Sequence, residues 1–289
     1  MTLSRMRTLL RTRRNIVKLS DRYYTGREVQ RLLGISEPQL RTLVSNRKLK
    51  KITPPGRKTG VYLKAEVDTY AEKWFAFLTI KEPPKSTFEI ATTEDMESVY
   101  SIAKKAISPN TMSAELRRSW LMKNKESCYI VKHDRRVVAF FHLLPIYHER
   151  LMSFMDGKIR GWDITEDDIV AFESGRILEC LVIIASDPDV GEDARVHYVA
   201  TLIRGVIREV NKLGKRGVII TKIYATSETP TGIAMSIHAG MEQFGEKTGK
   251  RLKFRMDIKT SKVFIAQSYK KGFEEWQKGQ NLPAEIVSC

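Results

Sequence analysis

The stretch from Tyr24 to Tyr62 constrains the fold most, because it holds two short helix patterns separated by a glycine. Thr25 is a suitable N-cap, and Glu28 three residues later completes a capping box. Gly34 favours a helix end, since glycine tolerates the left-handed backbone found there. The apolar residues between these two signals recur at the spacing of one helix face: Val29, Leu32 and Leu33.

A second helix pattern begins at Ser36, which can cap it. Glu37 suits the positive end of the helix dipole, and Pro38 is tolerated in a first turn whose N–H groups have no intrahelical partner. The same apolar spacing returns at Leu40, Leu43 and Val44. Two short helices around a glycine turn predict a helix-turn-helix.

A basic segment follows these two helices. Pro54 to Gly60 is a basic loop between two short apolar runs, which predicts a strand, a loop and a second strand. The pattern from Lys64 to Phe77 predicts a third helix.

This arrangement resembles the MerR-like winged helix-turn-helix that phage excisionases share. The residues that match are Val29 to Arg41, with Gly34-Ile35-Ser36 at the turn, and Gly56, Arg57 and Tyr62 in the wing. The resemblance implies binding to double-stranded DNA, with the second helix in the major groove. A helical hairpin with a solvated basic face is the alternative.

The expected DNA contacts follow from side-chain chemistry, because short or donor-rich side chains suit base edges and cations suit phosphates. The expected base-reading residues are Gln39, Thr42, Ser45 and Asn46. The expected phosphate and flanking contacts are Arg27, Arg41, Arg47, Lys48, Arg57, Lys58 and Tyr62.

Charge is concentrated at the same end of the chain. The net charge is +16, and residues 1–80, with 18 basic and 6 acidic residues, account for +12 of it. Such a split is the electrostatic pattern of a nucleic-acid-binding module. We therefore expect a basic arm at 1–20, the winged module at 21–78, a Pro-Pro linker at 79–86 and a second domain at 87–289.

Composition also bears on the environment of the chain. Cys128, Cys180 and Cys289 lack metal-ligand spacing and are typical of reduced cytosolic thiols. No apolar run is long enough to span a membrane, and no histidine pair predicts a metal site. We expect a cytoplasmic, nucleoid-associated bacterial protein with no membrane partner and no metal.

From Thr87 the pattern becomes strand, two helices, hairpin, long strand, helix, strand, helix, hairpin. This order resembles the GNAT acyltransferase fold, with Thr92 to Asp95 before the first helix and Gly240-Met241 after the last one. The segment from His148 to Gly175 is additional and is interpreted as an insertion. The predicted fold class is α+β: a winged helix-turn-helix followed by a GNAT-like mixed α/β sheet.

The GNAT resemblance implies an acetyl-CoA or other acyl-CoA site, with glycines in the loop that holds the pyrophosphate. Counted back from Gly214, those glycine positions fall on His197 and Val199, and the preceding loop is rich in carboxylates. The resemblance also implies a tyrosine that serves as general acid to the leaving thiolate, and that position falls on Ser236, whose hydroxyl is a far weaker acid. Tyr198 or Tyr224 could serve as the general acid instead. Candidate ligand contacts are Ile183, Ala185, Arg195, His197, Val199 and Ser236; Glu173 and Glu179 are possible general bases or surface charges.

These observations leave three functions open. The leading expectation is a homodimeric DNA-binding transcriptional regulator whose GNAT-like domain senses an effector, dimerises or docks a partner, with no catalytic residues. The alternatives are an active acetyl-CoA-dependent N-acetyltransferase tethered to DNA, and an excisionase-like architectural DNA-binding protein.

Overall fold

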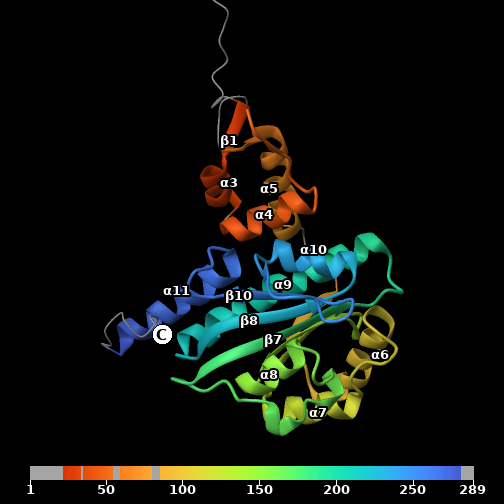
Figure 1. The fold of residues 1–289 in the computed structure, drawn as a ribbon. Helices are drawn as coiled ribbons and strands as arrows, with labels where there is room; N and C mark the ends of the chain where they lie inside the picture. The colour runs from red at the N-terminus through yellow and green to blue at the C-terminus, as the bar shows by residue number, and fades with distance from the viewer. Residues whose placement is uncertain (1–21, 34, 55–58, 80–84, 281–289) are drawn as a thin grey trace, which may run out of the picture.

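The computed structural model describes residues 22–33, 35–54, 59–79 and 85–280, in a small N-terminal part and a larger mixed α/β part (Figure 1). The basic arm at 1–20, Gly34, Arg57, Lys58 and the Pro83-Pro84 linker lie outside the described residues.

In the N-terminal part, the described residues form three labelled helices and a three-stranded antiparallel sheet in the order β1-β3-β2. Its elements are β1 (Tyr23–Thr25), α3 (Gly26–Leu33), α4 (Glu37–Ser45), β2 (Lys51–Ile52), β3 (Val61–Leu63) and α5 (Lys64–Thr79). The predicted third helix thus extends two residues beyond Phe77. The two short helices and the β2–β3 hairpin lie where the sequence patterns place them.

Local capping explains where the two short helices begin. The Thr25 amide donates to the Glu28 carboxylate at 2.7 Å. Ser36 and Gln39 form a reciprocal capping box, in which the Ser36 amide donates to Gln39 Oε1 and the Gln39 amide donates to Ser36 Oγ. Each helix then turns its apolar face inward, and Val29, Leu40 and Leu43 are buried.

The larger part is organised around a seven-stranded sheet with the order β4-β5-β6-β7-β8-β10-β9. All neighbouring strands are antiparallel except β7 and β8, which are parallel. The strands are β4 (Ser86–Ile90), β5 (Cys128–His133), β6 (Arg136–Pro145), β7 (Ile177–Ser186), β8 (Ile219–Ser227), β9 (Glu242–Gln243) and β10 (Leu252–Asp257).

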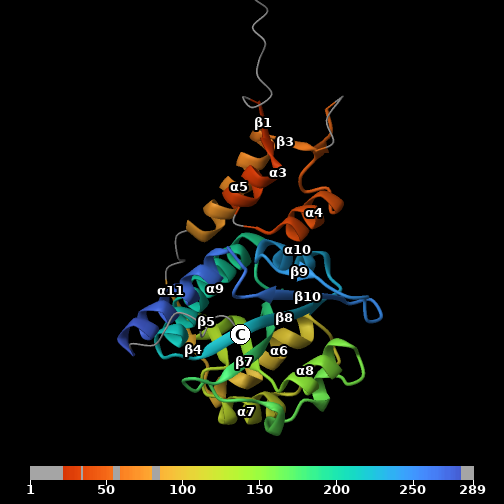
Figure 2. The ribbon, with the colours of Figure 1, turned by 60° about the vertical axis from the view of Figure 1, so that its left-hand side comes forward.

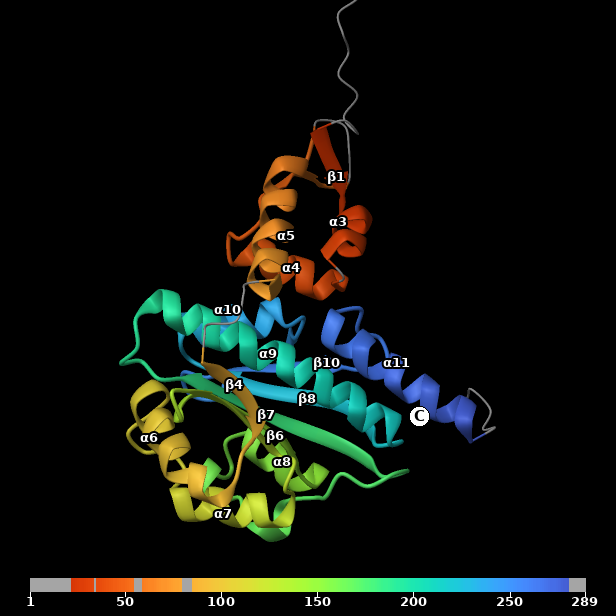
Figure 3. The ribbon, with the colours of Figure 1, turned by 180° about the vertical axis from the view of Figure 1, so that it is seen from behind.

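Helices cover both faces of this sheet (Figures 1 and 3). On one face lie α9 (Glu192–Lys215), α10 (Pro230–His238) and α11 (Phe264–Gly279). On the other lie α6 (Met96–Ala106), α7 (Ala114–Lys123) and α8 (His148–Met155). Short 3-10 turns are η1 (Thr93–Asp95), η2 (Gly161–Asp163) and η3 (Glu166–Asp168).

The connection order from β4 to β10 is the one expected from the GNAT resemblance. One element is corrected: the second strand of the hairpin predicted at the end of this order, at Lys262 to Gln267, does not form, because Phe264–Gly279 is the helix α11. The hairpin partner of β10 is instead the short β9, which precedes it. The apolar run at this position was too short for periodicity to separate strand from helix, and burial of Ala266, Tyr269 and Phe273 on one helix face decides it.

The additional segment 148–175 supplies α8, η2 and η3. These pack with α7 in an apolar cluster that includes Trp120, Leu151 and Ile169. The Trp120 indole donates to the Ile164 carbonyl at 2.9 Å, which ties the segment to α7. The segment therefore forms part of the helical layer on the α6–α7 face.

The N-terminal part lies against α10, β9 and α9 (Figure 2). One apolar cluster contains Leu40 and Leu43 of α4 together with Ile237 and Met241 at the end of α10. Within the described ranges, no helix has both the length and the apolar character needed to cross a bilayer.

Candidate functional site

The parallel strands β7 and β8 part along their length and open a wedge in the sheet. Their ladder starts at Ile177–Ile219 and ends at Leu181–Tyr224. Beyond it, β7 pairs with β6 as far as Ser186, and β8 pairs with β10 as far as Ser227. Open α/β sheets bind ligands at the carboxyl ends of parallel strands, so this wedge is the first candidate site.

Two predicted ligand residues lie on β7 within the wedge. Ile183 and Ala185 are partly exposed, and their side chains pack against the apolar cluster that holds α6 to the sheet. The alternate residues of the strand, Val182 and Ile184, pack toward the α9 side. The structure therefore supports the placement of Ile183 and Ala185 beside the wedge.

The predicted phosphate positions are wrong in register. Helix α9 begins at Glu192 with Gly191 as N-cap, so His197 and Val199 lie within the helix and not in the loop before it. The count back from Gly214 failed because α9 has 24 residues and begins earlier than the count assumed. Arg195 is in the first turn, where its amide donates to the Gly191 carbonyl at 3.0 Å.

Carboxylates occupy the start of α9. Glu192 and Asp193 are exposed in its first turn, where a helix would otherwise attract an anion. In the preceding loop, Asp187 is buried and accepts from Arg136, and Asp189 pairs with Lys105 at 2.5 Å. The Lys105 ammonium lowers the pKa of Asp189. The first turn of α9 therefore carries two exposed carboxylates, Glu192 and Asp193, together with the cation of Arg195.

Ser236 does not provide a proton donor for the wedge. It is buried in α10, and its hydroxyl donates to the Gly232 carbonyl at 3.0 Å. Tyr224, by contrast, is on β8 in the last pair of the ladder with β7. Burial, aided by the nearby Glu179 carboxylate, raises the pKa of Tyr224 to about 12. Its phenol is therefore protonated at neutral pH.

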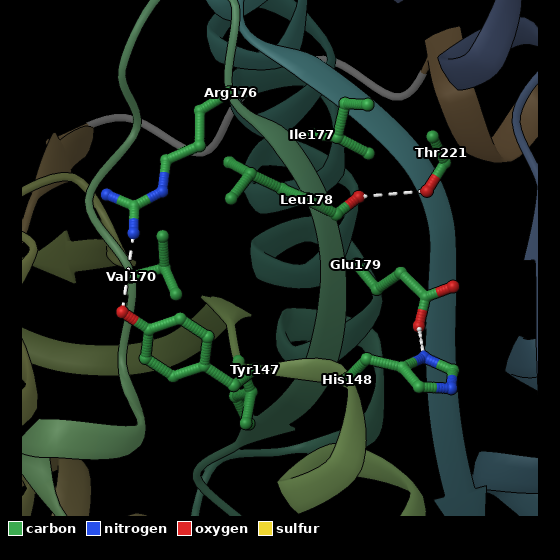
Figure 4. Close-up of a pocket in the computed structure, with 9 residues that line it drawn as sticks. Tyr147, His148, Val170, Arg176, Ile177, Leu178, Glu179 and Thr221 are labelled. Atoms are coloured by element: carbon green, nitrogen blue, oxygen red, sulfur yellow. Dashed lines mark hydrogen bonds and ion pairs between the residues drawn. The ribbon is translucent and has the colours of Figure 1, made fainter. Parts of the chain in front are cut away.

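A second group of polar residues surrounds Glu179, two residues before the end of the β7–β8 ladder. Its carboxylate accepts from His148 Nδ1 at 2.6 Å and from Lys222 Nζ at 3.1 Å. Only 13% of the Glu179 side chain is exposed. One carboxylate is thus fixed by a histidine from α8, as Figure 4 shows, and by a lysine from β8.

Glu179 and His148 border a pocket of about 360 Å³ on the α8 face of the sheet. Arg176 forms one side, and its guanidinium donates to Tyr147 Oη at 3.3 Å (Figure 4). The same guanidinium also donates to the Glu173 carboxylate at 3.0 Å. The other lining residues are Ile146, Val170, Ile177, Leu178 and Thr221. The pocket combines apolar walls with a carboxylate–imidazole pair, as small-molecule sites commonly do.

The structure separates the two possible general bases. Glu173 is an exposed surface charge paired with Arg176, whereas Glu179 lines the pocket. His148 and Lys222 were missed as partners of Glu179, because they lie 31 and 43 residues from it and only the fold brings them together. A cluster of three or more metal-ligating side chains is absent from the part of the chain that the structure describes.

The N-terminal part presents most of the predicted DNA contacts at its surface. Exposed residues are Arg27, Arg41, Ser45, Asn46, Arg47 and Lys48, and Thr42 is partly exposed. Two predicted contacts are buried: Tyr62 packs in the core, and Gln39 is 5% exposed, with its side chain used to cap α4. Neither side chain is available to DNA in this arrangement.

Comparison with known proteins gives likeness of structure only. No family model and no curated protein matches the chain. Three solved structures each resemble 60% of this chain: the putative acetyltransferase yncA from Salmonella typhimurium with acetyl-CoA, the loading GNATL domain of CurA from Lyngbya majuscula, and the PaiA N-acetyltransferase from Thermoplasma acidophilum with coenzyme A. In that order, their sequence identities to this chain are 12%, 12% and 10%, and the matched region covers 94%, 97% and 98% of their own chains. The TM-scores are 0.38, 0.42 and 0.38.

Proposed function

We propose that the mixed α/β domain is a GNAT-like N-acyltransferase that holds an acyl thioester in the wedge and an amine in the pocket beside it. The observation that carries this proposal is Glu179, whose carboxylate is fixed by His148 and Lys222 next to the point where β7 and β8 part. A general base must lie within hydrogen-bond reach of the proton that it takes, and the pocket offers such a position.

Each group then has a defined part in the reaction. Glu179 accepts a proton from the acceptor ammonium, and the freed amine attacks the thioester carbonyl. The new C–N bond forms as the C–S bond breaks, and the leaving thiolate takes a proton from Tyr224. The nitrogen then gives up its remaining excess proton to the Tyr224 phenolate, which leaves a neutral amide and a neutral phenol. His148 and Lys222 position the Glu179 carboxylate.

The test is release of thiol from acetyl-CoA in the presence of a panel of small amines. We expect Glu179→Gln to lower the rate by about a hundredfold or more, because general-base catalysis contributes on the order of 10²–10⁴. Glu173→Gln is the matched control, since it removes an exposed carboxylate from the same end of the sheet. Equal rates for the wild-type protein and Glu179→Gln would refute the assigned base.

We also propose that the N-terminal part binds double-stranded DNA as a winged helix-turn-helix. The observation in favour is the run of exposed donors from Arg41 to Lys48 on α4 and the turn after it, at the end of the chain that holds most of the net charge. A transcriptional regulator with a ligand-sensing domain, or an excisionase-like architectural protein, follows from this module.

Fluorescence anisotropy with a random-sequence duplex at several salt concentrations tests DNA binding. Affinity should fall steeply as salt rises, because phosphate contacts release counterions. Sedimentation of the free and DNA-bound protein tests the proposed homodimer. Absence of salt-dependent binding would leave the enzyme as the sole proposed function.

A further inference from the structure

The start of α4 is joined to the mixed α/β domain by direct contacts. The N-cap Ser36 donates from Oγ to Glu242 Oε1 of β9 at 2.7 Å. Tyr70 of α5 hydrogen-bonds through its hydroxyl to His238 Nδ1 at the end of α10 at 2.6 Å. The rings of Tyr70 and His238 are stacked, with centroids 5.1 Å apart. Two polar contacts and a shared apolar cluster therefore hold the two parts together.

These contacts cover the end of α4 that a DNA-reading helix uses. Helix-turn-helix proteins place the first residues of the second helix against base edges. Here a β9 side chain lies at hydrogen-bond distance from Ser36, which leaves no room for a duplex whose major groove alone is about 12 Å wide. Glu242 also places a negative charge where phosphates would approach.

We infer that the mixed α/β domain blocks DNA access to α4, and that DNA binding requires the Ser36–Glu242 and Tyr70–His238 contacts to open. This inference rests on the proposed DNA-binding role of the N-terminal part. The described protein is the closed form, and an open form exposes the start of α4. The measured DNA affinity is then the affinity of the open form multiplied by its population.

In the Tyr70–His238 hydrogen bond, the donor and the acceptor can each be assigned. Burial raises the pKa of Tyr70, so that its hydroxyl is a donor. Burial and the charge of Lys48 lower the pKa of His238, so that its neutral Nδ1 is an acceptor. Removing one hydroxyl therefore weakens the closed form without altering any residue proposed to touch DNA.

The experiment measures anisotropy of a labelled random-sequence duplex of about two helical turns with the full chain at low salt. The test variants are Tyr70→Phe and Glu242→Ala. The matched controls are Tyr100→Phe, which loses a hydroxyl on α6, and Glu246→Ala, which loses an exposed carboxylate in the β9–β10 hairpin. Hydrogen exchange of the α4 amides, without DNA, reports opening directly.

We expect each test variant to bind DNA about fivefold more tightly, the effect of one net hydrogen bond on a closed equilibrium. Exchange over α4 should rise in parallel, and both controls should match the wild-type protein. Unchanged or weaker binding by Tyr70→Phe and Glu242→Ala, with a wild-type protein that binds DNA, overturns the inference. Faster exchange in the variants with no DNA binding by any protein refutes the DNA-binding role itself, and the inference with it.

Discussion

The starts of α4 and α9 are two helix N-termini that the sequence assigns to ligands, α4 to DNA and α9 to the pyrophosphate of an acyl-CoA, and both lie beside carboxylates in the structure. At α4 the carboxylates are Glu37 of its own first turn, which is paired with Arg41, and Glu242, which comes from another part of the molecule. At α9 the carboxylates are Glu192 and Asp193, in the first turn of the helix itself. A contact between parts of a chain can open, whereas residues of the same turn cannot leave it. The first helix start is thus blocked reversibly and the second permanently.

The largest effect is expected when the packing of α4 is damaged rather than its surface contacts. Leu43 is buried at 2% exposure, so Leu43→Ala should cost about 2–5 kcal/mol of stability. Urea unfolding followed by circular dichroism measures this loss. DNA binding should fall because the module unfolds, unlike the gain expected for Tyr70→Phe. A Leu43→Ala protein that unfolds at the wild-type urea midpoint would contradict the packing of α4.

The permanence of the α9 block is tested by neutralising its first turn. Glu192→Gln with Asp193→Asn should tighten binding of CoA about tenfold, because two repelling charges near a helix start are removed. Isothermal titration measures the change. Glu166→Gln with Asp167→Asn, in the exposed η3 turn, is the matched control. Equal CoA affinity in the wild-type protein and the α9 variant would show that the start of α9 is not where the diphosphate lies.

Lowering the pH should open the contacts at the start of α4 and leave the start of α9 unchanged. Because the pKa of His238 is lowered in the folded protein, neutral His238 supports the closed form above about pH 6.5, the ordinary value for histidine. As pH falls below that value, protonation becomes favourable in the open form first, where His238 is away from Tyr70 and Lys48, and the closed form loses stability. The first turn of α9, from Glu192 to Arg195, holds no histidine, so this effect is expected at the start of α4 and not at the start of α9.

Hydrogen exchange of the α4 amides at pH 7.5 and 5.5, corrected for the intrinsic rate, measures this effect. We expect increased opening at the lower pH in the wild-type protein. His238→Gln is the control, because it cannot take up a proton in this range. The same pH dependence in His238→Gln would assign the effect to another group.

The smallest effect on stability is expected at the exposed face of α4. Arg41 and Glu37 form an ion pair at 2.5 Å, with 76% and 62% of their side chains exposed. Such a pair contributes about 0.3–0.5 kcal/mol, so Arg41→Ala should barely change the unfolding midpoint. The salt dependence of DNA binding should nevertheless decrease by about one phosphate contact. An unchanged salt slope would remove Arg41 from the proposed DNA surface.

Local sequence signals predicted the starts of α3 and α4 but not what surrounds them. Ser36 was identified as a cap, yet Gln39 three residues later completes a capping box, and this spacing was a readable sign that its side chain is engaged. The start of α9 was misplaced because the position was counted from the helix end, and the helix length was unknown.

Contacts between distant segments were beyond any local pattern. Glu179 was one of two equivalent carboxylates in the sequence, and only the packing of α8 and β8 against β7 distinguishes it from Glu173. The Ser36–Glu242 contact joins residues 206 positions apart, so no periodicity or capping rule could predict it. Chain order and element type were predictable because they depend on neighbours in sequence.

Strand β8 ends at Ser227, and α10 starts at Pro230. One short stretch therefore links a wall of the wedge to α10, whose His238 hydrogen-bonds to Tyr70 of α5. If occupation of the wedge shifts α10, the two binding events share one free energy of coupling. Thermodynamic reciprocity then requires that DNA alter the affinity for the thioester by the same factor by which the thioester alters the affinity for DNA. The fraction of protein bound to DNA would then depend on the concentration of acyl donor, and the amount of acyl donor bound would depend on the presence of DNA.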